Sequence, residues 1–163
     1  MNGIIERIRV YPAKGDAGRE LAEAALIENL GLEGDFHAAD GARQVSVLFA
    51  ETRNELAAQK EQGLCFSRFR ENITLRSNLP QEDLSQRRGD AEGNNVHSMS
   101  DVLRSGMRFT VGEAGLEIAD EVKRCHEECP LHKAGRQCPL AAKNLFAKVV
   151  KSGIIRVGDV ITT

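Results

Sequence analysis

Alternating apolar and polar positions divide much of the chain into short, strand-like segments. In residues 3–10, GIIERIRV, apolar residues at positions 4, 5, 8 and 10 are separated by polar ones, which predicts a strand with one buried face. The same alternation gives about six strand-like segments in all: residues 3–10, 43–49, 69–76, the two arms of a hairpin at 106–119, and 154–162, which a Gly158-Asp159 turn interrupts.

Helix-favouring composition is confined to a few segments. Residues 20–30, ELAEAALIENL, predict a short helix or turn, and residues 51–62 predict a helix that ends at Gly63. Pro139 suits the first turn of a further helix running to Ser152. Residues 77–100 are polar and predict an exposed loop. Because regular strand–helix alternation is missing, we expect a mainly β fold, a barrel or a sandwich, with two or three short helices.

Length and composition place the chain among ordinary globular proteins. Its 163 residues are 41% hydrophobic and 28% charged, which predicts a single domain spanning residues 1–163. The net charge of −2 argues against nucleic acid as a partner, although a local basic cluster stays open. Neither an apolar run long enough for a membrane span nor a secretory signal is present, so we expect a cytoplasmic protein without a membrane partner.

The loop at residues 31–37, GLEGDFH, is the first candidate for binding. Its glycines permit positive φ angles and close approach of a ligand, while Asp35 and His37 add an acceptor and a titratable ring. For an isolated Gly-Asp pair, a plain turn is the better interpretation. Arg43, at the start of the next strand, is placed to hold an anion. Asn72 precedes another strand and could bind a ligand, but such an asparagine is as often a turn cap.

Residues 122–140, VKRCHEECPLHKAGRQCPL, carry three of the four cysteines and two of the four histidines. Thiolates and imidazoles bind zinc tetrahedrally, and the candidate ligands of a structural zinc site are Cys125, Cys129, His132 and Cys138. Their spacing does not match the paired knuckles of zinc fingers, and an iron–sulfur cluster would need a more distant fourth ligand.

The alternative to a metal site is a catalytic or carrier role for one of these cysteines. Cys125 follows Lys123 and Arg124, whose charges favour a thiolate if they point toward it. A reversible disulfide between Cys125 and either Cys129 or Cys138 is a further alternative. Cys65 stands apart from the others, between Leu64 and Phe66, and we interpret it as a small buried hydrophobe.

One ordered set of motifs resembles the MOSC domain, the module named after the C-terminal part of molybdenum cofactor sulfurases. The set consists of GLEGDFH, RQVSVL, FRENITL, GMRFTVGEAGLEI, KRCHEECPL and LFAKVVKSGIIRVGDVI, and it extends from about Gly3 to Ile161. The small stand-alone bacterial members are the most similar. The resemblance implies a closed or partly closed β-barrel with a pocket that handles the molybdopterin form of the molybdenum cofactor, or sulfur destined for it.

The resemblance also implies roles for individual residues. The family's key cysteine maps onto Cys125, as molybdenum ligand or persulfide carrier. Its Gly-Asp, Arg-Gln and Glu-Asn-Ile motifs map onto Gly34 and Asp35, Arg43 and Gln44, and Glu71, Asn72 and Ile73. For the cofactor phosphate we expect Arg43, Arg124 and Lys148, on chemical grounds.

The implied partners are the cofactor, a small-molecule substrate such as an N-hydroxylated base to be reduced, and a sulfur donor or redox protein. Two departures from the family pattern concern the longer polar loop at residues 83–100, and Gln137, which stands where small members often have an aspartate. The alternative from another class is a non-enzymatic β-barrel module, with a structural zinc site or a thiol switch at Cys125, Cys129 and Cys138.

Overall fold

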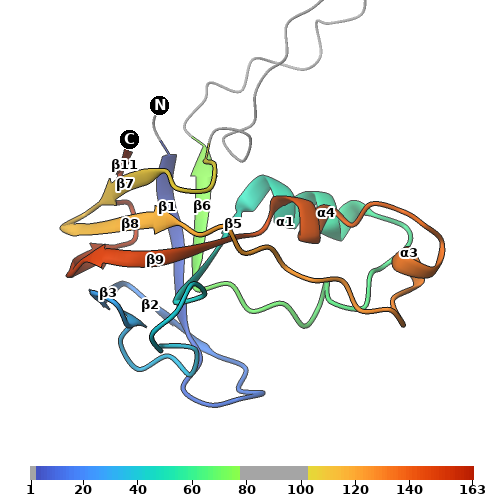
Figure 1. Ribbon diagram of the computed structural model, residues 1–163, viewed down its shortest axis with the longest axis horizontal. Coiled ribbons are helices and arrows are strands. Elements are labelled where there is room, and N and C mark those ends of the chain that lie inside the picture. The colour runs from blue at the N-terminus through green and yellow to red at the C-terminus, as the bar shows by residue number, and fades with distance from the viewer. Residues whose placement is uncertain (1–2, 78–102) are drawn as a thin grey trace, which may run out of the picture.

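The computed structural model describes residues 3–77 and 103–163, and within these ranges the strands form two sheets (Figure 1). The larger sheet has eight strands in the order β11-β7-β8-β9-β5-β6-β1-β2. In chain order they are β1 Gly3–Val10, β2 Arg19–Leu21, β5 Val45–Phe49, β6 Ile73–Ser77, β7 Arg108–Val111, β8 Ala114–Ile118, β9 Leu145–Lys151 and β11 Ile161–Thr162. The smaller sheet joins β10 Gly153–Arg156, β3 Glu23–Ile27 and β4 Gly31–Leu32.

The larger sheet curls until its first and seventh strands in spatial order approach each other. Ile4 of β1 forms an isolated antiparallel bridge with Val160, which precedes β11. The backbone of Ile5 donates to the carbonyl of Asp159 at 2.9 Å and accepts from Gly158 at 2.8 Å. These contacts satisfy part of the sheet edge, so the expected partly closed β-barrel is confirmed.

Side chains that point into the curled sheet form the main core. Strand β1 has the burial pattern that its alternation predicts, because Ile5, Ile8 and Val10 are buried while the residues between them are more exposed. They pack with Val47, Phe49 and other apolar residues of the neighbouring strands. Burial of this apolar surface is the main stabilising term of such a fold.

Two predicted helices are wrong, since both segments join the sheets. Residues 20–30 hold β2 and β3, and β3 is paired on both sides, with β10 and with β4. The helix predicted from Pro139 to Ser152 ends after five residues as α4 Pro139–Lys143, and β9 follows between β5 and β8. In both segments strand pairing outweighs helix propensity.

The helices of the described residues gather on one side of the curled sheet (Figure 1). They are α1 Ala50–Ala58, α3 Pro130–Lys133 and α4. The predicted helix at residues 51–62 is therefore correct in place but too long. The side-chain amide of Gln62 donates to the carbonyls of Leu56 and Gln59, at 3.3 and 2.5 Å, and so satisfies backbone groups at the helix end.

A second, smaller core lies beneath these helices. Buried Leu48, Leu56, Phe66 and Leu140 form it together with Cys129, and the other three cysteines pack against its edge. The cysteine loop is thus anchored on apolar side chains.

The remaining predicted strands are confirmed, including the hairpin of β7 and β8 and the interrupted final strand. The expected loop at 77–100, with the departure at 83–100, lies almost wholly outside the described residues. None of the described helices is long and apolar enough to cross a membrane.

Candidate functional site

A cavity of about 330 Å³ lies where the loop after β4, the segment before β6 and the start of the cysteine loop meet. Its lining includes four cationic side chains, Arg43, Arg68, Arg70 and Lys123, and two histidines, His37 and His126. No carboxylate is among the described lining residues. On a chain whose net charge is −2, this is a local concentration of positive charge, and an anionic ligand would be attracted to it.

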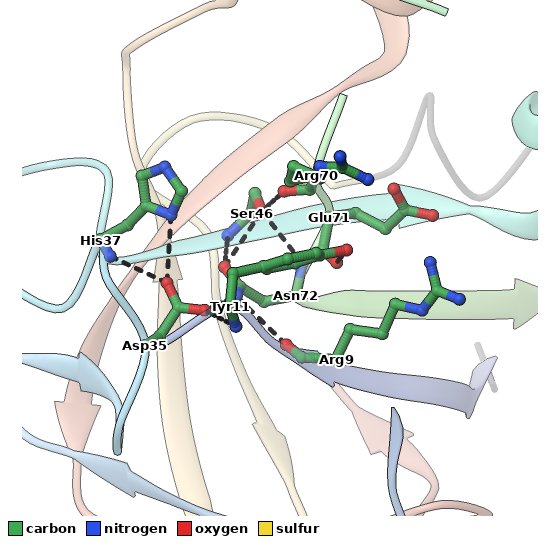
Figure 2. A network of polar contacts seen from close by, with 8 residues as sticks. All are labelled: Arg9, Tyr11, Asp35, His37, Ser46, Arg70, Glu71 and Asn72. Atoms are coloured by element: carbon green, nitrogen blue, oxygen red, sulfur yellow. Dashed lines mark hydrogen bonds and ion pairs between the residues drawn. The ribbon is translucent and has the colours of Figure 1, made fainter. Parts of the chain in front are cut away.

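The carboxylate of Asp35 contacts the lining residues His37 and Asn72 from behind the cavity wall, and Figure 2 shows the polar network around it. One oxygen accepts from the backbone of Tyr11 at 2.9 Å and from the side-chain amide of Asn72 at 2.8 Å. The other accepts from the backbone of His37 at 2.9 Å and lies 3.1 Å from Nδ1 of the same residue. Gly34, with φ of 77°, permits the turn that directs Asp35 inward. Asp35 thus positions the lining residues His37 and Asn72.

Asn72 is buried at the cavity wall, and its side chain is fully used within the protein. Its amide donates to Asp35 and to the carbonyl of Arg9, and its oxygen accepts from the backbone and the hydroxyl of Ser46, at 3.0 and 3.1 Å. An asparagine amide has two hydrogens, and both are taken here. Asn72 therefore joins three segments of the chain and has no free donor for a ligand.

The cations of the cavity differ in how far they are already engaged. Arg43 forms an ion pair with Glu121, donates to the carbonyl of Val122 at 3.1 Å and stacks 4.8 Å over the ring of Phe146. Arg70 lies 5.7 Å from the Tyr11 ring centroid. Within the described ranges, neither Arg68 nor Arg70 pairs with a carboxylate. These two guanidinium groups are the ones most available to an incoming anion.

All four cysteines converge on a second pocket, of only about 10 Å³, beside the cavity. Its lining is Gly63, Cys65, Lys123, Arg124, Cys125, Cys129, Cys138 and Ala141. The interpretation of Cys65 as a buried hydrophobe apart from the others is wrong, because its thiol is only half-buried and accepts a hydrogen bond from Nζ of Lys123 at 3.2 Å. Because Cys65 is distant from the other three cysteines in the sequence, their spacing could not indicate that the four lie together.

The surroundings of Cys125 and Cys129 shift the pKa values of the two thiols in opposite directions. The backbone N–H of Leu64, 3.5 Å from the Cys129 sulfur, is the main cause that lowers the pKa of the Cys129 thiol, although burial opposes it. Burial raises the pKa of Cys125, and the neighbouring Cys129 raises it further. Cys129 is thus the more acidic thiol, and Cys125 the one held protonated.

Several solved structures have a fold similar to that of this chain. YuaD from Bacillus subtilis superposes with a TM-score of 0.62 and 17% identity, over 99% of this chain and 94% of that one. YiiM from Geobacillus stearothermophilus gives a TM-score of 0.56 and 15% identity, over 99% of this chain and 75% of that one. For YiiM from Escherichia coli the values are 0.53, 16%, 99% and 68%.

The chain has the fold of these proteins. Their likeness supports the MOSC-like architecture that the sequence motifs imply, and at these identities it concerns the fold alone. No family model and no curated protein matches the sequence.

The predicted site residues fall into separate groups. His37, Arg43 and Asn72 line the cavity, with Asp35 behind them. Arg124 and Cys125 line the smaller pocket instead. Gly34 shapes its turn, and Lys148 is exposed on β9 opposite Glu117, among the lining residues of neither pocket.

Several lining residues were missed by sequence reasoning. They are Cys65, Arg68, Arg70 and His126, and Lys123 was considered only as a neighbour of Cys125. The segment CFSRFREN did carry a signal, since two arginines alternate with phenylalanines just before the Asn72 strand.

The metal alternative finds no support in the arrangement of side chains. Among the residues that the structure describes, no group of three or more His, Cys, Asp or Glu side chains is placed to hold a metal ion. His132 is exposed on α3, whereas Cys129, at the start of that helix, is buried. A zinc site formed by Cys125, Cys129, His132 and Cys138 would require these side chains to move.

Proposed function

We propose that this chain binds a molybdenum-pterin cofactor in the cationic cavity, with the adjoining thiols serving as molybdenum ligand or sulfur carrier. The observation that carries the proposal is a cavity with four cations and no carboxylate in its described lining, beside four clustered cysteines. Its volume of about 330 Å³ lies at the lower end of the roughly 300–1,000 Å³ that small-molecule sites occupy.

The chemistry of the donor groups fits such a cofactor. Its phosphate suits Arg68 and Arg70, because guanidinium groups bind phosphate oxygens in a bidentate manner. Thiolates can ligate its metal or carry its sulfur, and Cys65 lines the cavity while Cys125 lies in the adjoining smaller pocket. Apolar Leu64, Phe69 and Phe146 provide walls against which a flat ring can pack.

Within this proposal the lining residues have distinct tasks. Arg68 and Arg70 bind the anion. Arg43, paired with Glu121, forms part of the wall, and Asp35 positions Asn72. Since Asp35 holds Nδ1 of His37, the ring can present Nε2 to a molecule in the cavity and accept or donate a proton there.

When bound, the cofactor would supply two-electron redox chemistry at its metal. Reduction of an N-hydroxylated base consumes two electrons and two protons and releases water, and His37 is the candidate to deliver a proton. This oxidoreductase activity extends the binding proposal, and it calls for an electron-donating partner protein. The sulfur-carrier form calls for a sulfur donor instead.

The test is expression in a host that makes the cofactor, followed by measurement of molybdenum and pterin per chain. Wild type is expected to retain both, and the double variant Arg68→Met/Arg70→Met should lose at least about tenfold in occupancy, because each lost charge-assisted contact costs about 1.5–3 kcal/mol. Cys125→Ala should lower molybdenum content. The matched control is Arg19→Met, an exposed arginine on β2 away from the cavity. Equal, near-zero loading of all variants would contradict the proposal.

A further inference from the structure

Cys65 has a position that no other cysteine shares, because its side chain lines both the cavity and the smaller pocket. Cys125, Cys129 and Cys138 line only the smaller pocket. A sulfur atom on Cys125 would therefore lie behind the cavity wall, and Cys65 is the thiol that stands between the two spaces.

The backbone and Lys123 hold Cys65 in this place. The carbonyl of Cys65 accepts from the backbone amides of Arg68 and Phe69, at 3.0 and 2.8 Å. Lys123 lines both spaces as well, and its ammonium donates to the Cys65 sulfur at 3.2 Å. A positive charge there stabilises negative charge as it develops on the sulfur.

We propose that Cys65 is the acceptor thiol of a two-cysteine relay, which takes a sulfane sulfur from Cys125 and presents it in the cationic cavity, with Lys123 as positioning residue. The relay rests on the sulfur-carrier form of the proposed function. It assigns the contact with the cavity ligand to Cys65 and leaves Cys125 as the entry point for sulfur.

The transfer is balanced without any further reagent. The sulfur of Cys65 attacks the terminal sulfur of a Cys125 persulfide, and one S–S bond forms at Cys65 as the S–S bond at Cys125 breaks. The electron pair of the broken bond stays on the Cys125 sulfur. One proton moves from Cys65 to Cys125, so a thiol and a persulfide exchange places with no net oxidation.

The size of the smaller pocket suits the transfer of a single atom. Its volume of about 10 Å³ is close to the roughly 10–15 Å³ that one water molecule needs. One added sulfur atom is of comparable size, whereas a cofactor does not fit. Gly63, which lines this pocket, packs closely on Phe66, since a Cβ there would lie 2.6 Å from the ring.

The experiment follows the sulfur itself. The purified full chain is exposed briefly to inorganic polysulfide, persulfides are trapped with an alkylating reagent, and each cysteine is quantified by peptide mass spectrometry. Wild type is expected to carry persulfide on Cys65. In Cys125→Ser, labelling of Cys65 should fall about tenfold, whereas in Cys65→Ser the label should stay and accumulate on Cys125.

Control variants separate the relay from general thiol reactivity. Cys138→Ser, which alters the same small pocket, should leave labelling of Cys65 within about twofold of wild type. Lys123→Met should lower labelling of Cys65 but not of Cys125, and Lys123→Arg should restore most of it, while Lys14→Met in an exposed turn changes nothing. Thermal unfolding of each variant reports whether it is folded.

The outcomes distinguish the relay from the cofactor proposal. Equal labelling of Cys65 with and without Cys125, or labelling of Cys125 with none on Cys65, overturns the relay even in chains that contain molybdenum and pterin. Absence of persulfide on every cysteine also overturns it. If labelling of Cys65 requires Cys125 in chains that never bind molybdenum, the result supports the relay and contradicts the proposal that the cavity binds the cofactor.

Discussion

The fully buried Asp35 side chain lies 3.1 Å from Nδ1 of His37, whose ring is half-exposed at the cavity wall. Asp35 Oδ1 also accepts from the backbone of His37, and Oδ2 accepts from Tyr11 and Asn72. Because this carboxylate accepts from three N–H groups and acts as an acceptor, its contact with His37 is a hydrogen bond when Nδ1 carries the proton. The pair thereby fixes which ring nitrogen is available to a ligand.

The tautomer of His37 is therefore a testable consequence. We expect neutral His37 to carry its proton on Nδ1, whereas exposed His132, which pairs with no carboxylate among the described residues, should favour Nε2. Long-range proton–nitrogen NMR correlations distinguish the two forms in the ligand-free protein. A His37 spectrum of the Nε2–H type would contradict the assignment.

Replacement of Asn72 should destabilise the fold as well as the site. Asn72→Ala removes one of the donors to Asp35 and the acceptor of the Ser46 backbone N–H in a buried region, and each buried hydrogen-bonding group left unsatisfied costs about 1–3 kcal/mol. Denaturant unfolding should show a loss of at least this size. Asn54→Ala, on the exposed face of α1, is the matched control and should change the free energy of unfolding by less than about 0.5 kcal/mol. Equal effects of both substitutions would exclude the proposed role of Asn72.

Sequence patterns were informative where local and tertiary preferences agree. Strand β1 matches its predicted bounds because its apolar residues alternate and one of its faces is buried. Residues 20–30 and 145–151 were misassigned, since their composition favours helix while the neighbouring strands β10, β5 and β8 provide pairing partners. Pairing with distant strands leaves no local signal in the sequence.

Some residues of the candidate site could likewise be predicted from the sequence, and others could not. Loop and strand positions point to Asp35, His37, Arg43 and Asn72 as candidates, and in the structure the last three line one cavity with Asp35 behind it. Cys65 could not be predicted, because it lies 58 residues from its partner Lys123 and has no local motif. Lys148 was favoured by charge alone, yet it lies on the exposed face of β9, which only the register with β8 reveals.

Tyr11 provides a probe of the network, since it is the only tyrosine and the chain has no tryptophan. Burial raises the pKa of Tyr11 above its ordinary value of 10.0, and its hydroxyl donates to the Glu71 carbonyl at 3.1 Å. Alkaline titration of the tyrosine absorbance should therefore show ionisation above pH 10 in the folded chain. Ionisation at or below the ordinary value would contradict this prediction.

The same shift predicts a dependence of stability on pH. A folded-state pKa above the unfolded one gives stabilisation that is complete below the unfolded value and is lost as pH rises through the folded value. Unfolding measured on both sides of pH 10 should show this loss for wild type. In Tyr11→Phe the loss should be smaller, and an identical pH profile in the two chains would count against Tyr11 as its source.

The acidities of Cys125 and Cys129 give a last prediction for the cysteine cluster. Because the N–H of Leu64 lowers the pKa of Cys129 while burial raises that of Cys125, the ultraviolet absorbance of thiolate should appear in separate steps as pH rises. Cys129→Ser should remove a step below the ordinary thiol value of 9.0, and Cys125→Ser a step above it. Removing Cys129 should also lower the pKa of Cys125, since one cause of its rise is the neighbouring sulfur. If both substitutions removed the same step, the two thiols would not differ as the structure requires.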